Sequence, residues 1–217
     1  MLRPTSIAIL TTAVCLSASA FASTTYYVGT CHKSAPIYST ISAAVSSVPS
    51  GSTVLVCPGN YPEQVLITRP LTLKGLPGQG AASVVVPLGG VLTQYNSAQI
   101  LVQNPGGPVT ITNLVVDGTG GTIPNPALGG SIVGIDYQNT SGGSISYTSV
   151  RNQAGCLCGI GIEVYGDGGA LEIYGNVVRG QDSGGVFVAN SSPNIRANTV
   201  HPASGVYGGI SLAQIGG

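Results

Sequence analysis

Two short sequence units alternate along the second half of this chain, and their recurrence constrains the fold more than any other feature. The first unit opens with an isoleucine followed by strand-forming residues, at Ile111, Ile145, Ile173 and Ile195. The second unit is a glycine followed by Ile or Val, beginning at Gly134, Gly161, Gly185 and Gly209. Repeats of roughly 20 to 50 residues are typical of solenoids, in which each repeat stacks on the previous one.

Strands this short, with no helical pattern between them, predict an all-β solenoid, a parallel β-helix, rather than a leucine-rich or ankyrin array. Successive coils then stack at roughly 4.8 Å, and the inward Ile and Val side chains form apolar ladders. Asn176 and Asn198 fall in one column of the alignment. We therefore expect an asparagine ladder at one turn, where stacked amides bond to each other.

One helix is expected before the repeats, over residues 37–48. Ile37, Ile41, Ala44, Val45 and Val48 follow helical spacing, and Pro49-Ser50-Gly51 ends the pattern. Short strands follow over residues 53–57, 65–68 and 71–74. Such a helix can cover the open end of a stacked β-core, which would otherwise expose apolar side chains and an unpaired edge.

The first residues have the pattern of a secretory signal peptide. Arg3 precedes an apolar stretch from Ile7 to Leu16, and Ala20-Phe21-Ala22 places small residues at the positions that signal peptidase reads. We expect a signal peptide over residues 1–22 and one β-helix domain over residues 23–217, with repeats clearest from 109 to 217. No later segment is apolar enough for a membrane span. The sequence thus predicts a secreted, periplasmic or cell-envelope protein.

Charge is scarce along the whole chain. Only 6% of the residues are charged, and the net charge is zero, whereas roughly 25% is usual in globular proteins. A chain without net charge gives no electrostatic basis for binding nucleic acid or an anionic membrane surface. We therefore expect neither as a partner.

Four cysteines follow the predicted signal peptide, and an exported chain favours disulfides. Cys31 and Cys57 are expected to form a disulfide near the start of the fold. Cys156 and Cys158 leave two alternatives open, a bridge within a turn or two thiols. No matching His or Cys pair accompanies them, so the spacing gives little support for metal binding.

The segment from Tyr38 to Val45, together with residues 51–67 and 69–75, closely resembles the N-terminal capping segment of the pectin-lyase-like superfamily. Pectin methylesterases and periplasmic repeat proteins such as nitrous-oxide reductase accessory proteins share this segment. The resemblance implies a right-handed parallel β-helix with a short N-terminal capping helix. It also implies a cleft built from loops that flank one sheet. The resemblance is specific for the fold and carries little information on activity.

An acidic column is the first candidate site. If the isoleucines before them point inward, Asp136 and Glu163 point outward as neighbours on adjacent coils, followed by Phe187. The two carboxylates are candidate catalytic residues for cleaving a glycosidic bond, or candidate ligands for Ca²⁺, the one cofactor considered. Phe187 is a candidate substrate contact. The alternative is that both carboxylates are hydrated surface groups.

A second outward column is predicted to hold Asp117, Arg151, Arg179 and His201. Asp117 beside Arg151 would form a surface ion pair worth about 0 to 1 kcal/mol. Arg151, Arg179 and His201 are candidate contacts for an acidic sugar, because a guanidinium matches a carboxylate with two hydrogen bonds. The alternative is a solvated stripe that discourages sideways association.

No catalytic motif of the resembled superfamily is complete. Gly59-Asn60-Tyr61-Pro62-Glu63 is similar to a pectin methylesterase motif, but relatives without esterase activity share it, and the later Asp pair and Arg of the esterases find no match. The polygalacturonase and pectate-lyase patterns are also absent. We therefore expect Glu63 to be structural.

Aromatic side chains offer a further way to hold sugars, although tyrosine is also an ordinary strand residue. Eight tyrosines are considered for such stacking: Tyr26, Tyr27, Tyr61, Tyr95, Tyr137, Tyr165, Tyr174 and Tyr207.

The end of the chain lacks a polar capping segment after the strand that contains Leu212. A solenoid needs its ends covered for solubility. Three interpretations are open: a truncated chain, a partner over the end, or end-to-end self-association.

Three functions remain open at this level. The leading hypothesis is an exported β-helix that binds a cell-surface or environmental polysaccharide along the face carrying Asp136 and Glu163. The first alternative is a polysaccharide lyase or glycoside hydrolase that uses this pair. The second is a structural or adhesion module of the cell envelope without a sugar site. The fold hosts too many functions to choose among them by analogy.

Overall fold

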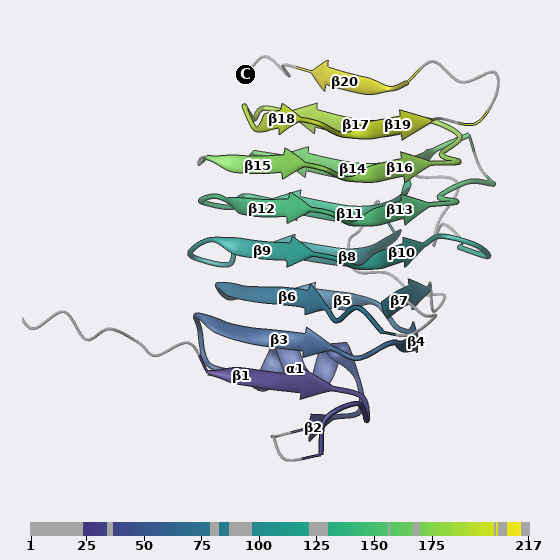
Figure 1. Ribbon diagram of the computed structural model, residues 1–217. Coiled ribbons are helices and arrows are strands. Elements are labelled where there is room, and N and C mark those ends of the chain that lie inside the picture. The colour runs from purple at the N-terminus through teal and green to yellow at the C-terminus, as the bar shows by residue number, and fades with distance from the viewer. Residues whose placement is uncertain are drawn as a thin grey trace, which may run out of the picture.

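The computed structural model describes residues 24–33, 37–78, 83–86, 97–121, 130–155, 157–166, 170–201, 203 and 208–213. Its strands pair in parallel and stack in coils around one core (Figure 1). The expected all-β parallel β-helix is confirmed.

Three sheets, here called A, B and C, run the length of the stack. Sheet A contains β2 (Ile37–Tyr38), β1 (Thr25–Val28), β3 (Ser52–Val56), β6 (Leu71–Gly75), β9 (Val109–Thr112), β12 (Gly143–Ser146), β15 (Leu171–Tyr174) and β18 (Asn194–Arg196). Sheet B contains β4 (Gly59–Pro62), β7 (Ser83–Val86), β10 (Val115–Asp117), β13 (Ser149–Arg151), β16 (Val177–Arg179) and β19 (Thr199–His201). Sheet C contains β5 (Val65–Ile67), β8 (Ser97–Gln103), β11 (Ile132–Gln138), β14 (Gly159–Tyr165), β17 (Gly184–Ala189) and β20 (Ile210–Ala213).

The two sequence units correspond to different sheets. The first unit crosses from sheet A into sheet B, and Ile111, Ile145 and Ile173 lie in register on neighbouring strands. The second unit forms sheet C, where Ile135 pairs with Ile162. The unequal spacing of the repeats reflects loops of different length between sheets B and C.

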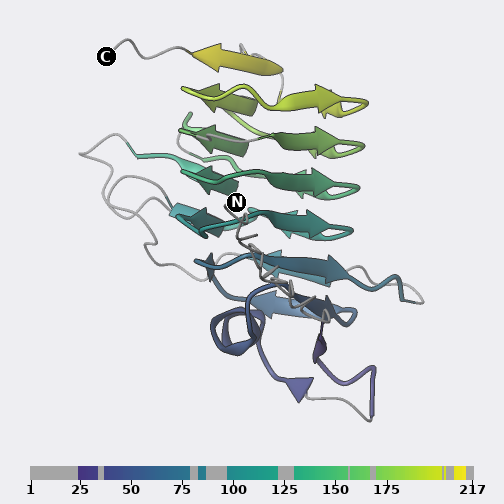
Figure 2. The same ribbon diagram turned by 90° about the vertical axis from the view of Figure 1, so that its left-hand side faces the viewer.

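Inward side chains of all three sheets form one buried core of Val, Ile and Leu. Sheets A and C lie on opposite sides of this core (Figure 2). The Tyr137 side chain of sheet C reaches across it, and its hydroxyl donates to the Val109 carbonyl of sheet A at 3.0 Å. The fold therefore presents two long outer faces that point in opposite directions.

The single helix in the described part of the chain is α1 (Ile41–Ser47), shorter than the expected residues 37–48. Thr40 caps it, because its side chain accepts from the Ala43 backbone N–H at 3.1 Å. Ile37 instead pairs with Tyr27 in sheet A and is half-exposed. Ile41 and Val45 join the core as expected, so the helix packs on the first coils of the stack.

The predicted asparagine ladder is confirmed at the turn from sheet A to sheet B. The Asn176 amide donates to Asn198 Oδ1 at 3.0 Å and to the Ile145 carbonyl at 2.8 Å. Thr148 occupies the next position of this column, and its backbone N–H donates to Asn176 Oδ1. The buried amides thus tie three successive coils together.

The predicted Cys31–Cys57 disulfide is present, with its Cα atoms 5.6 Å apart. Cys158 is also disulfide-bonded. The alternative of two thiols is therefore wrong for Cys158. Cys156 and the predicted signal peptide over residues 1–22 lie outside the described residues. Within the described residues, no helix is long and apolar enough to cross a membrane.

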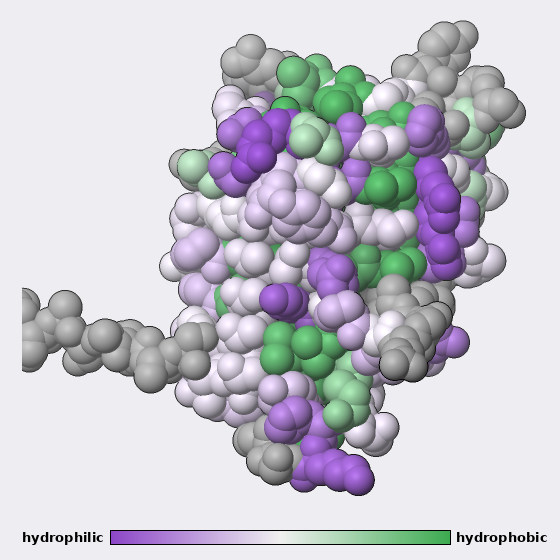
Figure 3. Space-filling view, viewed as in Figure 1, coloured by the Kyte–Doolittle hydropathy of each residue, from purple (hydrophilic) through white to green (hydrophobic). Residues whose placement is uncertain are grey.

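At the end of the stack formed by β20, apolar side chains reach the surface (Figure 3). Ile210 and Leu212 continue the inward columns of Val186 and Val188, yet Leu212 is 74% exposed. End-to-end association, one of the three interpretations left open by the sequence, stays a prediction.

Candidate functional site

The outer face of sheet C carries the acidic column expected from the sequence. Asp136 and Glu163 are partners in register on β11 and β14, and Glu163 is followed by Phe187 on β17. Ser211 on β20 comes next, and Leu101 on β8 precedes Asp136. In-register neighbours in a sheet lie roughly 4.8 Å apart, so this column is continuous along the stack.

The expectation that Asp136 is a hydrated surface group is wrong. Its side chain faces away from the core, but its exposed fraction is 0%. Leu101 and Val133 on the same outer face are also fully buried, in a second apolar cluster with Ala98 and Ile160. Strand alternation predicts the side of the sheet on which a residue lies, but not what packs over that side. In this conformation Asp136 does not reach solvent.

Glu163 differs from Asp136 because it is partly exposed. Burial raises the pKa of the Glu163 carboxyl from its usual 4.5 to about 7. A protonated carboxyl donates as well as accepts a hydrogen bond. Near neutral pH this side chain can therefore act as a donor toward a bound hydroxyl or ether oxygen.

Two aromatic side chains flank Glu163. Phe187 is its in-register neighbour and packs against the second apolar cluster. Tyr165 lies two residues along β14, on the same outer face, and is 42% exposed. Glu163, Tyr165 and Phe187 together form a partly exposed strip, which we call the sheet C strip.

Amide side chains extend the polar part of this face. Gln138 Nε2 donates to Asp136 Oδ2 at 2.7 Å, and Gln103 Nε2 donates to Gln138 Oε1 at 3.1 Å. Gln138 is also the in-register neighbour of Tyr165. The chain of hydrogen bonds orients the Gln138 amide beside the sheet C strip.

The acidic pair does not form a Ca²⁺ site on its own. Calcium takes about six to eight oxygen ligands, and the Gln138 amide presents its nitrogen to Asp136 while its oxygen accepts from Gln103. Within the described residues, no group of three or more His, Cys, Asp or Glu side chains gathers around a common point. Asp136 and Glu163 stay two candidate ligands, fewer than the number that Ca²⁺ takes.

The second predicted column lies on sheet B, on a different face from the acidic pair. Asp117, Arg151, Arg179 and His201 are in register, and hydrophilic side chains gather over this edge of the stack (Figure 3). Arg151 Nε lies 2.9 Å from Asp117 Oδ2, which confirms the expected ion pair. Arg179 and His201 are exposed. These residues are not brought together with Asp136 and Glu163.

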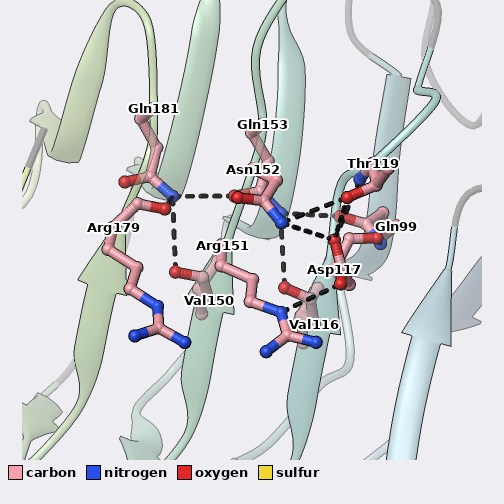
Figure 4. Close-up of polar contacts among 10 residues, drawn as sticks. All are labelled: Gln99, Val116, Asp117, Thr119, Val150, Arg151, Asn152, Gln153, Arg179 and Gln181. Atoms are coloured by element: carbon pink, nitrogen blue, oxygen red, sulfur yellow. Dashed lines mark hydrogen bonds and ion pairs between the residues drawn. The ribbon is translucent and has the colours of Figure 1, made fainter. Parts of the chain in front are cut away.

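Asp117 is held by several donors (Figure 4). Burial alone would raise the pKa of its carboxyl, but hydrogen bonds from Thr119, Asn152 and Arg151 outweigh burial and lower the pKa to about 2. The carboxylate closes the turn after β10 and anchors Arg151. Its contacts are those of a structural ion pair.

A buried glutamine ladder at the corner between sheets B and C was not expected from the sequence (Figure 4). Gln153 Nε2 donates to Gln99 Oε1 at 2.8 Å, and Gln181 Nε2 donates to Gln153 Oε1 at 2.8 Å. All three amides are buried. A Cβ at Gly134 would lie 2.5 Å from Val150 Cγ1 and 3.1 Å from Gln153 Nε2, so the glycine that opens this second unit was the available signal.

Glu63 has the structural role expected for it. Its carboxylate accepts from the backbone N–H groups of Ile41 at 2.8 Å and Ser42 at 2.7 Å, at the start of α1. Helix N-termini favour negative charge, so this contact fixes the helix against the coil that follows β4.

A groove of about 410 Å³ lies between α1 and β5. Leu66, at its edge, is the first member of the outer column that continues to Leu101 and Asp136. The buried Leu101 and Asp136 separate the groove from the sheet C strip. The groove is lined by Ser42, Ala43, Ser46, Gln64, Leu66, Thr68 and Arg69.

These features define the class of protein as a parallel β-helix with a partly exposed strip of one carboxyl group, two aromatic rings and an amide. The crystal structure of Escherichia coli YbhC is similar to this chain with a TM-score of 0.51 and 14% sequence identity. The similarity covers 100% of this chain and 70% of YbhC. At this identity it supports the fold alone. No family model matches the chain, and no curated protein matches it in sequence.

Proposed function

We propose that this chain is an exported protein of the pectin-lyase-like superfamily and binds a polysaccharide along the outer face of sheet C. The observation that carries the proposal is the sheet C strip, in which Glu163 has Phe187 as its neighbour on β17 and Tyr165 two residues further along β14. Aromatic rings offer rigid apolar contact area to a sugar face. A neutral carboxyl and an amide beside them supply donors and acceptors for sugar hydroxyls.

Burial supports binding over cleavage by two carboxylates. A glycosidase of the usual kind places both carboxyl groups against the scissile bond. Asp136 has no exposed surface, so only Glu163 of the pair meets a ligand in this conformation. The disulfide between Cys31 and Cys57 supports export, because such bonds persist in oxidising compartments.

The test is affinity electrophoresis of the mature protein through gels that contain pectate, xylan, mannan, cellulose derivatives or chitosan. We expect retardation by at least one polymer. The double substitution Tyr165→Ala and Phe187→Ala should remove most of it, because two ring contacts are lost. Val177→Ala, at a partly exposed valine on sheet B, is the control and should migrate like the wild type. Equal retardation of all three proteins, or none by any polymer, would count against the proposal.

A second candidate function is cleavage of the bound polymer. The raised pKa of Glu163, about 7, suits a general acid near neutral pH, and Asp136 is its in-register neighbour. The two functions separate in Glu163→Gln, which preserves shape and hydrogen bonding but holds no transferable proton. Binding without products, unchanged in Glu163→Gln, supports the first function. Reducing ends or unsaturated products that disappear in Glu163→Gln would establish the second.

A further inference from the structure

A tyrosine cluster lies on the outer face of sheet A, opposite sheet C. The rings of Tyr147 and Tyr174 meet edge to face, with centroids 5.2 Å apart and planes at 84°. The Arg196 guanidinium lies 4.4 Å from the centre of the Tyr174 ring and pairs with Glu172 at 3.3 Å. Tyr147 was not among the tyrosines considered from the sequence.

The backbone of Tyr147 is unusual for a bulky residue. Its φ is 50°, in the left-handed region that Asn and Gly prefer. Asn113, Gly175 and Ala197 hold the equivalent place in other coils and share this left-handed backbone. Such a conformation costs roughly 1 kcal/mol for a residue with a side chain, and strain of this kind concentrates where a side chain is used.

The Tyr147 ring is packed on one side and remains largely exposed to solvent. A Cβ at Gly175 would lie 2.9 Å and 3.0 Å from two of its ring carbons, so the ring rests on the glycine backbone of the next coil. The Tyr147 side chain is nevertheless 64% exposed. A fixed, exposed ring loses little entropy when a ligand covers it.

The residues around the two tyrosine rings indicate which kind of ligand would bind there. Glu172 and Arg196 neutralise each other, and the Ser146 hydroxyl is already bonded to Thr112 at 3.0 Å. The surface therefore presents a ring, a donor and an acceptor without net charge. The C–H groups on one face of a pyranose carry partial positive charge and suit the negative face of a tyrosine ring. A neutral sugar fits this combination better than an anion.

We propose that Tyr147, Tyr174, Glu172 and Arg196 form a second binding site, for a neutral pyranose unit of a polysaccharide. The site is independent of the sheet C strip, because the two lie on opposite faces of the stack (Figure 2). Two sites that face in opposite directions allow one molecule to bind two polymer strands at once. The overall avidity then rises although neither site binds more tightly by itself.

Calorimetric titration with cellohexaose, mannohexaose and xylohexaose tests the proposal, with hexagalacturonate as the anionic comparison. We expect a neutral hexasaccharide to bind and Tyr147→Asn to weaken that site about tenfold or more, the equivalent of about 1.4 kcal/mol. Tyr147→Phe, which keeps the ring, should retain binding. Because Asn favours the left-handed conformation, Tyr147→Asn should unfold at the same temperature as the wild type or higher.

The double substitution Tyr165→Ala and Phe187→Ala serves as the matched control, because it removes the sheet C strip alone. If it abolishes binding while Tyr147→Asn binds every probe like the wild type, the second site is overturned and the sheet C proposal stands. If only Tyr147→Asn loses binding, the second site stands and the sheet C proposal fails. Absence of neutral hexasaccharide binding to the wild type at millimolar concentrations would also overturn the second site.

Discussion

The outer faces of sheets A and C are built by the same coils, yet they offer different chemistry. On sheet A, outward side chains such as Thr112, Ser146 and Tyr174 bond or pack with one another. On sheet C, the outward column passes through the buried Leu101 and Asp136 before it reaches the partly exposed Glu163. Register decides which residues are neighbours on either face. Burial then decides which of those neighbours can meet a ligand.

The largest effect is expected where sheet C joins sheet B. Gln153→Leu removes the middle amide of the glutamine ladder. Gln99 Oε1 then loses its donor at 2.8 Å, whereas Gln181 Nε2 keeps the Arg179 carbonyl at 2.9 Å. Buried polar groups left unpaired cost about 1 to 3 kcal/mol each. Urea unfolding should show a loss of about 2 kcal/mol. Gln103→Leu, which removes one hydrogen bond between two partly exposed amides of sheet C, is the control and should lose less than half of that.

An equal loss in Gln153→Leu and Gln103→Leu would mean that the buried ladder does not anchor sheet C. It would also weaken the interpretation of Gly134, which leaves room for the Gln153 side chain.

The next largest effect is a pH dependence of folding stability that distinguishes Glu163 on sheet C from Glu172 on sheet A. The folded pKa of Glu163 is about 7, above the usual 4.5, so between these values the folded state holds a proton that the unfolded state has lost. Stability from this group is therefore full below pH 4.5 and falls as the pH rises to about 7. Glu163→Gln should remove this fall and gain about 1 to 3 kcal/mol at pH 8 relative to pH 4.

Glu172→Gln on sheet A is the matched control for this experiment, because Glu172 lies in an exposed pair with Arg196 worth about 0 to 1 kcal/mol. Thermal unfolding from pH 4 to pH 8 measures both variants. A Glu163→Gln curve parallel to that of the wild type would contradict the burial assigned to this carboxyl.

The smallest effect on stability is expected on sheet B, at Asp117. Asp117 has a pKa of about 2, below the usual 3.8, so its contribution to stability is present above pH 3.8 and is lost as the pH falls toward 2. Asp117→Asn should cost about 1 kcal/mol at pH 7 and nothing near pH 2. Chemical unfolding at both values checks this. A cost that persists at pH 2 would show that packing, not charge, holds the turn.

The fold could be predicted from the sequence because the repeats fix the register. Placing Ile145 beside Ile111 and Ile135 beside Ile162 also aligns Asp117 with Arg151 and Asp136 with Glu163. The columns, the ion pair and the asparagine ladder all follow from that alignment. The N-terminal helix was predicted four residues too early, because helical spacing did not reveal that Ile37 pairs in a strand.

The chemistry of the site could be predicted only in part. Strand alternation placed Asp136 on the outer face, but its burial depends on packing that no local pattern encodes. Tyr147 was not predicted, because the residues at the same place in other coils, Asn113, Gly175 and Ala197, share no side-chain type that would mark a left-handed turn. The glutamine ladder was not predicted, because Gln99, Gln153 and Gln181 are separated by unequal numbers of residues, 54 and 28.

Chemical-shift mapping by NMR tests the central claim most directly. The labelled mature protein is titrated with the polysaccharide fragment that it retains best. We predict that the largest amide shifts fall on Glu163, Tyr165 and Phe187, while Arg179 and His201 on sheet B stay unchanged. Shifts confined to sheet B, or none on β14 and β17 at saturation, would contradict the claim that the outer face of sheet C binds polysaccharide.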